Sequence, residues 1–359
     1  MCKRILASQT NAEGGVPFYK IGTIGGTPNA YISKELFDEY KEKYNYPHKG
    51  EVMITCAGTV GKCVIYDGKD AYYQDSNIVW IDNPSHNISN GFLYHLLSNV
   101  DWRKLNSTTI IRIYNDDLRN LKLNYPLREE QQRICKLLSL LDERIAAQNK
   151  IIEDLKKLKS AIIDYAINSL NTDFAKFGSL YEMAGEGGTP TTSNASFYDN
   201  GKIPFIKIDD LKQKYLTENK DFITELGLQK SSAWLVPTHS ILFSNGATIG
   251  EISITTYSVC TKQGILGIVP KQNIDVEFLY YFMSSSYFKK AVSRIVTEGT
   301  MKTAYLKDIN NILCPIPTKK EQQEIAKIPS ALNSKIDTEK SILNLLITQK
   351  QHLLHQMFI

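Results

Sequence analysis

The stretch Glu130-Gln131-Gln132-Arg133-Ile134 returns 191 residues later as Glu321-Gln322-Gln323-Glu324-Ile325. A proline stands four residues before each stretch, Pro126 in the first instance and Pro317 in the second. One such string is weak evidence by itself, and its weight depends on further matches in the same order.

Further matches extend the repeat over most of the chain. Pro17-Phe18-Tyr19-Lys20-Ile21 returns as Pro204-Phe205-Ile206-Lys207-Ile208, and Gly58-Thr59-Val60-Gly61 returns as Ala247-Thr248-Ile249-Gly250. Phe92-Leu93-Tyr94 likewise returns as Phe278-Leu279-Tyr280, and the offset changes only between 186 and 191 residues along the chain, as short loop insertions would cause. Because the same order of strings is hard to obtain twice by chance, the sequence predicts two copies of one architecture.

A long amphipathic helix is predicted at the end of each copy. From residue 128 to about residue 169 neither Gly nor Pro occurs, and apolar residues recur at alternating spacings of four and three, which is the pattern of a coiled-coil seam. A stripe of Leu and Ile has to be buried, so the second helix is the natural partner of the first. The predicted seam residues are Ile134, Leu138, Leu141, Ile145, Ile152, Leu155 and Ile162 in the first helix and Ile325, Leu332, Ile336, Leu343, Leu346 and Leu353 in the second.

Two polar residues interrupt the predicted seam in each copy. Gln148 and Lys159 in the first helix recur as Glu339 and Lys350 in the second. We expect the pairs Gln148/Glu339 and Lys159/Lys350 to set the register of the two helices. Pro329, in the second copy, should kink that helix or delay its start.

The first part of each copy is predicted to be a strand-rich α/β domain. Short β-type runs alternate with turn residues, as in residues 51–55 before Gly58, 77–81 before Pro84 and 240–243 before Asn245. Helical stretches are interleaved, for example residues 33–44 and 278–292. The predicted fold is therefore α+β, with a first domain at 1–125, a first long helix at 126–172, a second domain at 173–316 and a second long helix at 317–359.

Composition and charge are those of an ordinary globular protein. The 359 residues are 42% apolar and 22% charged, which allows two or three domains with sizeable cores. A net charge of +4 permits nucleic-acid binding without arguing strongly for it. If DNA is a ligand, the positive charge has to be concentrated on particular faces.

Cysteine usage and apolar content predict a cytoplasmic protein. No cysteine pair has the spacing of a metal finger, so free thiols in a reducing compartment are expected. The first ten residues lack the apolar core of a signal peptide, and no stretch approaches the roughly 18 apolar residues of a membrane span. The six cysteines are Cys2, Cys56, Cys63, Cys135, Cys260 and Cys314.

Strings that resemble catalytic motifs are each better explained as ordinary structure. Gly58-Thr59-Val60-Gly61-Lys62 lacks the spacing of a phosphate-binding loop, and Glu251 replaces the lysine in the second copy, so a tight turn between strands is predicted. Asp67-Gly68-Lys69 has no second metal ligand before it, as a nuclease site would need, and is interpreted as an exposed turn. Asn83-Pro84-Ser85-His86 lacks the second proline and the aromatic residue of an amino-methyltransferase loop.

Metal binding is likewise not predicted. His352 and His355 lie three residues apart on the last helix without further potential ligands beside them, and a solvated helix face explains them better. We therefore expect no catalytic residue, and no metal or cofactor bound by this chain.

Basic and aromatic residues mingle in the stretches where the two copies differ most, such as 34–49 and 212–230. Lys and Arg neutralise phosphates, and Arg, Lys, Asn, Gln and Tyr can reach base edges. A duplicated DNA reader would keep its framework and vary such loops, whereas for any single residue a solvated surface is the alternative. The candidate DNA-binding residues are Lys34, Lys41, Lys43, Tyr44, Lys62, Thr109, Arg112, Tyr114, Lys207, Lys212, Lys214, Thr300, Lys302 and Tyr305.

Two nonidentical domains, each followed by a long helix that opens with Pro-x-x-x-Glu-Gln-Gln-x-Ile, resemble the DNA-specificity subunit of type I restriction–modification systems. The resemblance implies that each domain reads a few base pairs of a split target. It also implies that the two helices pack antiparallel and fix the length of the unread spacer. The matching residues are Pro126, Glu130, Gln131, Gln132 and Ile134, then Pro317, Glu321, Gln322, Gln323 and Ile325.

The same resemblance implies partners. Two modification subunits, which hold S-adenosylmethionine and methylate adenine, are expected to dock on this chain, and motor-nuclease subunits that use ATP and Mg are expected to join them. Double-stranded DNA is the expected ligand of the chain itself. The alternative is a coiled-coil adaptor with two globular heads and no DNA readout.

One departure concerns the start of the first copy. In the second copy Phe177-Gly178-Ser179-Leu180 precedes Gly187-Gly188, and the first copy, which starts at Met1, has no such segment. The first domain is therefore expected to be short at its N-terminus, which puts its first strand in doubt.

Overall fold

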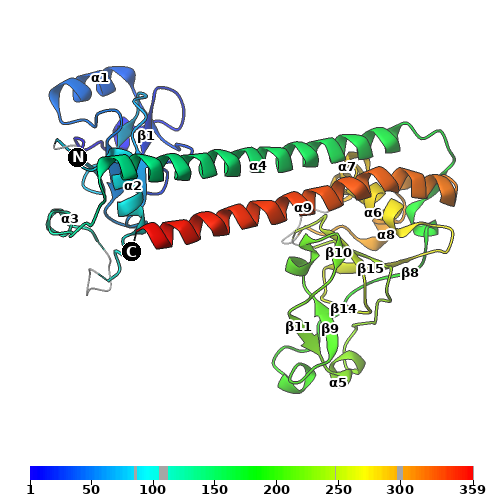
Figure 1. Ribbon diagram of the computed structural model, residues 1–359. Helices are drawn as coiled ribbons and strands as arrows, with labels where there is room; N and C mark the ends of the chain where they lie inside the picture. The colour runs from blue at the N-terminus through cyan, green and yellow to red at the C-terminus, as the bar shows by residue number, and fades with distance from the viewer. Residues whose placement is uncertain (85–86, 105–111, 247, 297–301, 359) are drawn as a thin grey trace. The chain divides into compact units, whose positions relative to one another are not determined.

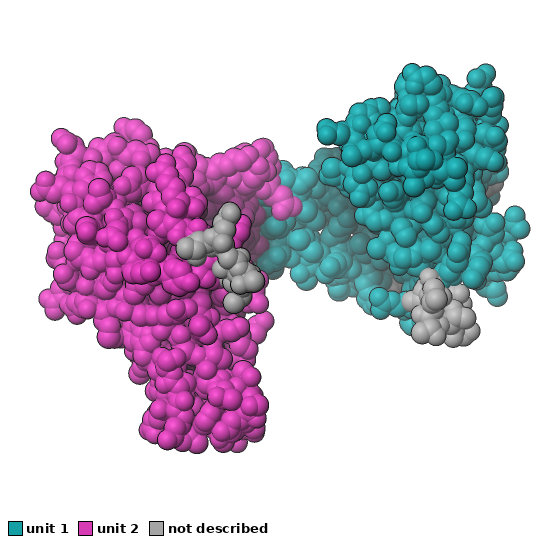
Figure 2. Space-filling view, turned by 180° about the vertical axis from the view of Figure 1, so that it is seen from behind, with its two compact units in different colours: residues 1–148, 342–359 teal, residues 149–341 magenta. Residues whose placement is uncertain are grey.

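The computed structural model contains the two predicted long helices, α4 (Arg128–Asn168) and α9 (Lys319–Met357) (Figure 1). The structure describes residues 1–84, 87–104, 112–246, 248–296 and 302–358. Unit 1 comprises residues 1–148 and 342–359, and unit 2 comprises residues 149–341 (Figure 2). Each long helix therefore contributes one part to each unit.

Local electrostatics and capping explain where the long helices begin. Glu129 and Glu130 lie in the first turn of α4, where negative charge interacts favourably with the helix dipole. At the start of α9 the backbone N–H of Thr318 donates to Glu321 Oε2 at 2.8 Å, and the N–H of Glu321 donates to Thr318 Oγ1 at 3.4 Å. This reciprocal capping box fixes the first turn of α9, and the hydrogen bonds from Thr318 lower the pKa of Glu321.

Pro329 does not delay the start of the second helix. The helix α9 begins at Lys319 and continues through Pro329, so the expectation of a late start is wrong. Proline removes one backbone donor and crowds the preceding turn, but the capping box and the burial of Gln322 and Ala326 hold the turns before it.

Two small sheets form the strand-rich part of unit 1. In the first, with the order β2-β1-β5, strand β1 (Val16–Tyr19) pairs antiparallel with β2 (Tyr31–Ile32) and parallel with β5 (Tyr72–Tyr73). In the second, β3 (Val52–Thr55) lies between β4 (Cys63–Ile65) and β6 (Ile78–Ile81), antiparallel to both. The accompanying helices are η1 (Ala7–Gln9), α1 (Lys34–Lys43), α2 (Asn90–Asn99) and α3 (Asn115–Arg119).

Unit 2 has a larger sheet and two smaller ones. The five-stranded sheet has the order β10-β13-β12-β15-β8, a three-stranded sheet has the order β11-β9-β14, and β16 pairs with β7. The strands are β7 (Phe174–Lys176), β8 (Tyr181–Glu186), β9 (Ile203–Ile206), β10 (Tyr215–Leu216), β11 (Asp221–Ile223), β12 (Ile241–Ser244), β13 (Ile252–Thr255), β14 (Cys260–Thr261), β15 (Ile265–Pro270) and β16 (Leu313–Pro315). The helices are η2 (Phe177–Ser179), η3 (Ala195–Phe197), η4 (Ile208–Lys212), α5 (Glu225–Gln229), α6 (Val276–Ser284), α7 (Ser286–Ile295) and α8 (Leu306–Ile309).

The central strands of the two units are copies of each other. Strand β3 pairs with β6 so that Val52 lies opposite Ile81, and β12 pairs with β15 so that Ile241 lies opposite Ile268. The third strand, β4 or β13, flanks the other side in the same antiparallel sense. Together with the two long helices, these strand-rich domains confirm the predicted α+β fold.

The apolar cores explain why these short elements are ordered. In unit 1, Phe37 and Tyr72 are fully buried in one core cluster, and Leu97 and Trp102 are buried in another. The largest cluster lies in unit 2 and also takes side chains from the end of α4, including Ile163. All six cysteines are free, and five of them are buried. No helix among the described residues combines the length and apolar content that a membrane span requires.

Candidate nucleic-acid interface

The two long helices contact each other through a pair of equivalent polar contacts. In unit 2, Lys159 Nζ donates to Asn333 Oδ1 at 3.0 Å, and in unit 1, Lys350 Nζ forms an ion pair with Asp142. Residue numbers rise along α4 from Asp142 to Lys159 while they fall along α9 from Lys350 to Asn333, so the helices are antiparallel. The two contacts are repeat equivalents, because Lys350 lies 191 residues after Lys159 and Asn333 lies 191 residues after Asp142.

The predicted pair Lys159/Lys350 is therefore wrong. Because the two helices run in opposite directions, the two lysines do not meet each other. Lys159 faces Asn333, and Lys350 faces Asp142, which is the repeat equivalent of Asn333. Burial lowers the pKa of Lys159, and the nearby Asp337 carboxylate opposes that shift. Gln148 and Glu339 are both buried, and Glu339 also pairs with Lys335 on its own helix at 2.5 Å; their mutual role in register stays a hypothesis.

The predicted seam residues all lie at positions that are at least half buried. The buried ones are Leu138, Leu141, Ile152, Ile336 and Leu346. The half-buried ones are Ile134, Ile145, Leu155, Ile162, Ile325, Leu332, Leu343 and Leu353.

The first glutamine of each Glu-Gln-Gln string joins its helix to its domain. Gln131 Oε1 accepts the backbone N–H of Ser89 at 2.8 Å, and its Nε2 donates to the carbonyls of Asn87 at 3.0 Å and Pro126 at 2.9 Å. Gln322 makes the same three bonds with its own neighbours, with the N–H of Asp275 at 2.7 Å and the carbonyls of Asn273 and Pro317 at 3.3 and 2.9 Å. Both side chains are almost completely buried. Sequence reasoning used these glutamines as a marker and missed that they are anchors.

The candidate lysines on α1 are paired with carboxylates. Lys34 contacts Asp38 and Asp70, each at 2.9 Å, Lys41 contacts Asp70 at 3.2 Å, and Lys43 contacts Glu39 at 3.0 Å. Hydrogen bonds from Lys34 and Lys41 lower the pKa of Asp70. Tyr44 is exposed beside this group, with Lys3 Nζ 5.3 Å from its ring centroid. The α1 surface of unit 1 is thus locally charge-balanced.

A second basic group of unit 1 surrounds the turn that joins β3 to β4. Lys62 lines a hollow of about 600 Å³ together with Gly61, Trp102 and Arg103. Gly61 has φ +83°, and a Cβ there would lie 2.2 Å from the Trp102 ring, so the close packing of turn and indole requires glycine. The backbone N–H of Lys62 donates to the buried Thr55 hydroxyl at 3.0 Å.

The same turn is built in unit 2, where the N–H of Glu251 donates to Ser244 Oγ at 2.8 Å. Both turns connect two antiparallel strands, as predicted, and neither opens a helix as a phosphate-binding loop would. Elsewhere in unit 1, Arg112 Nη2 donates to the Ser76 carbonyl at 3.3 Å, and its guanidinium lies 5.9 Å from the ring centroid of the exposed Tyr114. Thr109 lies outside the described residues.

The remaining candidates are in unit 2. Lys207 pairs with Asp221 at 2.8 Å, and Lys212 pairs with Asp209 at 3.1 Å. Lys302 lines a cavity of about 490 Å³ with Lys289. Tyr305 is exposed at the start of α8, and Thr300 lies outside the described residues.

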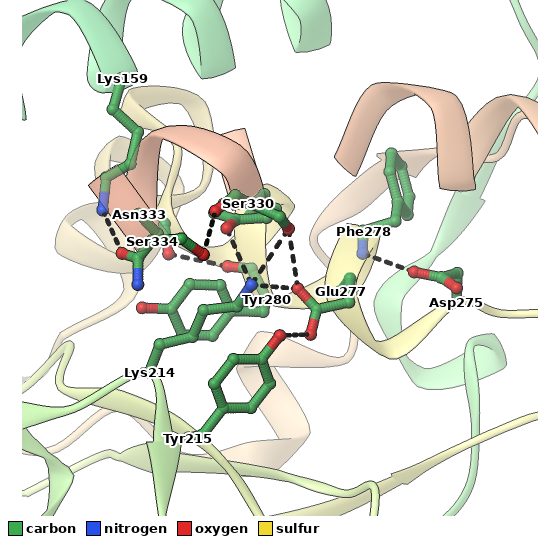
Figure 3. A network of polar contacts seen from close by, with 12 residues as sticks. Lys159, Lys214, Tyr215, Asp275, Glu277, Phe278, Tyr280, Ser330, Asn333 and Ser334 are labelled. Carbon is green, nitrogen blue, oxygen red and sulfur yellow. Dashed lines mark hydrogen bonds and ion pairs between the residues drawn. The ribbon is translucent and has the colours of Figure 1, made fainter. Parts of the chain in front are cut away.

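Lys214 is buried in a polar network that joins three segments of unit 2 (Figure 3). Its side chain is only 3% exposed and forms an ion pair with Glu277 on α6. Lys214 Nζ also donates to Tyr281 Oη at 2.9 Å and to Ser330 Oγ at 3.1 Å, and Ser330 lies on α9. Tyr215 Oη donates to the other oxygen of Glu277 at 2.5 Å. Because its three donors are used inside the protein, we leave Lys214 out of the DNA surface proposed below.

A cavity of about 580 Å³ beside this network gathers cations that the sequence reasoning did not select. Its lining includes Lys156 and Lys159 from α4, Lys289 from α7 and Lys340 from α9, against the acidic Asp337 and Glu251. Lys340 is paired with Asp337 at 2.9 Å. Ammonium groups gathered from several elements can neutralise phosphates. Sequence spacing gives no hint of this group, because it is assembled from segments far apart in the chain.

Comparison with known proteins identifies the family. The family model described as the type I restriction modification DNA specificity domain matches residues 1–157 and 171–347. A putative type I restriction enzyme specificity subunit from Haemophilus influenzae is 50% identical over 155 residues, which cover 43% of this chain and 40% of that protein. The putative MjaX specificity subunit from Methanocaldococcus jannaschii is 24% identical, over 96% of this chain and 89% of that protein.

Solved structures share the fold. The type I restriction–modification S subunit from M. genitalium matches with a TM-score of 0.56 and 19% identity, covering 100% of this chain and 92% of that chain. A chain from a study of complex assembly in a type I system matches with a TM-score of 0.62 and 16% identity, covering 97% of this chain and 92% of that chain. The family model matches most of the chain, and the solved structures share its fold, so the chain belongs to the family of type I restriction modification DNA specificity domains.

Proposed function

We propose that this chain is the non-catalytic DNA-reading subunit of a type I restriction–modification complex. Each strand-rich domain reads one half of a bipartite target, and the antiparallel helices fix the unread spacer between the halves. The observation that carries the proposal is the duplication itself. The two copies share turns, glutamine anchors and helix contacts, while their loops differ, as two readers of different short sequences would.

The DNA surface proposed for each copy is a hollow whose lining gathers cations from separate segments. In unit 1 this is the hollow lined by Lys62 and Arg103. In unit 2 it is the group around Lys156 and Lys289. Such cations supply affinity through phosphates, and base-edge contacts supply the sequence preference.

Partner subunits are expected on the outer apolar stripe of the long helices. This stripe consists of exposed apolar residues that lie outside the seam, and three of them, Ile151, Leu158 and Tyr165, follow one another at heptad spacing along α4. In the antiparallel pair, Leu137 of unit 1 and Ile328 of unit 2 are repeat equivalents, and both are exposed. Exposed apolar stripes mark docking sites for other helices, and an exposed apolar position that occurs once in each unit, Leu137 and Ile328, suits two copies of one partner. Its members are Leu137, Leu140, Ile151, Leu158 and Tyr165 on α4 and Ile328 and Leu345 on α9.

We propose that the partners on this stripe are two modification subunits and that motor-nuclease subunits join the complex. S-adenosylmethionine, ATP and Mg are assigned to those subunits and not to this chain. The adaptor alternative predicts no DNA binding by the purified chain. A reader should bind duplex DNA with an affinity that falls steeply as salt rises, and binding that is absent at low salt would favour the adaptor.

The decisive experiment is to map methylated adenines in cells that carry this chain and its modification subunit. A bipartite methylated sequence is expected. Exchange of residues 1–125 for those of another specificity subunit should change one half of that sequence and leave the other half intact. Methyl transfer by the purified chain alone, or a swap that alters both halves, would overturn the proposal.

A further inference from the structure

Beside the turn between β12 and β13, unit 2 contains the cavity of about 490 Å³, which we name the α7 cavity because several of its lining residues lie on helix α7. Its volume falls within the range of about 300–1,000 Å³ that is usual for small-molecule sites. Its walls are mostly apolar, and two cations stand beside them. The lining residues on which the argument depends are Phe243, Met283, Phe288, Val292, Lys289 and Lys302.

The equivalent place in unit 1 is occupied by an aromatic ring. At the offset of 186 residues that relates α2 to α6, Trp102 corresponds to Phe288 and Arg103 corresponds to Lys289. These residues line the hollows beside the two equivalent turns. A Cβ on Gly61 would lie 2.2 Å from the Trp102 ring, so in unit 1 the indole packs directly on the glycine of the turn.

In unit 2 no such ring covers the turn. Phe288 is 0% exposed and packs in the core, with ring centroids 5.5 Å from Phe177 and 6.0 Å from Phe243. Gly250, the equivalent of Gly61, also has a positive φ, of +109°, and no atom of the described residues lies within 4 Å of a Cβ built on it. The α7 cavity therefore has room for a flat ring at the place where unit 1 holds an indole.

The charges beside the α7 cavity favour a ring that carries negative charge. Lys289 and Lys302 are both exposed, and no carboxylate belongs to the described lining of this cavity. A nucleobase joined to its phosphate fits this combination, because bases stack on aromatic and apolar faces and ammonium groups pair with phosphates. Gly250 and Lys289 also line the cavity of about 580 Å³, so the α7 cavity shares part of its lining with the proposed DNA surface of unit 2.

We propose that the α7 cavity binds one unpaired nucleotide. The base lies against the apolar walls, in the place that Trp102 takes in unit 1, and the phosphate lies on Lys289 and Lys302. The nucleotide is either free in solution or part of bound DNA, with its base turned out of the duplex. The second source rests on the proposed function, whereas the site itself rests on the packing and charge of unit 2.

The test follows the methyl group of Met283, which lines the α7 cavity, by NMR of the full chain labelled at its methionine methyl groups. The probe is deoxyadenosine monophosphate (dAMP), and saturable binding with a Kd below about 1 mM is expected. The Met283 signal should shift, whereas the signal of Met53, which is buried in unit 1, should not. Ribose 5-phosphate lacks the base and uncharged N-acetyltryptophanamide lacks the phosphate, so each should bind at least about tenfold more weakly.

Two neighbouring lysines on α7 provide a matched pair of variants. Lys289→Gln should weaken the binding of dAMP by about three- to tenfold, whereas Lys290→Gln, at the next exposed position, should leave it unchanged. Val292→Phe places a ring in the cavity and should abolish the shift of Met283. Because Val292 is buried, the two lysine variants, which change exposed side chains, carry the test if Val292→Phe does not fold.

A duplex with the bipartite sequence found by methylation mapping separates the two sources of the nucleotide. A shift of Met283 with this duplex identifies a base of bound DNA, and a shift with dAMP alone identifies a free nucleotide; either result supports the site. A chain that binds dAMP but no DNA would refute the proposed function and leave the site standing. No saturable shift with either probe, equal binding of ribose 5-phosphate or N-acetyltryptophanamide, or equal effects of the two lysine variants would overturn the proposal.

Discussion

The glutamine anchors allow a sharp test of what holds each domain on its helix. In Gln322→Met the side chain keeps its length but loses three hydrogen bonds, which leaves the N–H of Asp275 and the carbonyls of Asn273 and Pro317 without their partner. An unsatisfied buried polar group costs about 1–3 kcal/mol. Because water reaches some of these groups after relaxation, we expect a loss in the free energy of unfolding of about 3–5 kcal/mol.

The neighbouring residue of the same string is the matched control. Gln323 is exposed, so Gln323→Met should change the free energy of unfolding by less than about 0.5 kcal/mol. Urea unfolding measures the stability of both variants, and amide exchange reports the local effect, because the Asp275 N–H loses its acceptor only in Gln322→Met. The reasoning fails if Gln322→Met costs no more than Gln323→Met or leaves exchange at Asp275 unchanged.

Three further predictions concern charge. Burial, together with the nearby Lys350 cation, lowers the pKa of His95 to about 4, so the folded state resists protonation of this histidine. The free energy of unfolding should therefore be highest above the unfolded pKa of about 6.5 and fall by up to about 3 kcal/mol as the pH drops toward 4. His95→Phe should flatten that dependence in urea unfolding measured across this range. Lys214→Met leaves the Glu277 carboxylate without its cation and should cost about 3–5 kcal/mol, with part of the loss recovered by adding Glu277→Gln; equal loss in both variants would contradict the ion-pair account. Lys156→Ala with Lys289→Ala should weaken DNA binding equally for all sequences and lower the salt slope by about 2, measured by fluorescence anisotropy, and an unchanged slope would remove this cavity from the DNA surface.

The repeat and the long helices could be predicted because their signals are local. A seam of Leu and Ile is visible in any window of two turns, and a string of five residues needs no tertiary structure to be recognised. The partner of Lys159 could not be predicted in this way. Repeat equivalence pointed to Lys350, but only the antiparallel direction of the helices decides that Asn333 faces it.

The candidate DNA-binding lysines show a second limit. Lys34 is paired with Asp70, which lies 36 residues away, and Lys214 is buried against Glu277 and Ser330. Composition gives the number of cations, but folding decides which of them are neutralised or buried. The cluster of Lys156, Lys289 and Lys340 escaped notice for the same reason, since three separate helices bring these residues together.

The contacts that recur in both copies, and those that do not, divide the molecule by role. The glutamine anchors and the lysine contacts between the helices occur twice, and both lie where a helix meets a domain or the other helix. Among the described residues the Lys214 network is found in unit 2 alone, because Gly91 of unit 1 stands where unit 2 has Glu277. Repeated contacts fix the frame in which the domains are held, whereas single contacts shape one domain. A reader of two different half-sites needs this combination, since its frame has to be common to both halves while its reading surfaces have to differ.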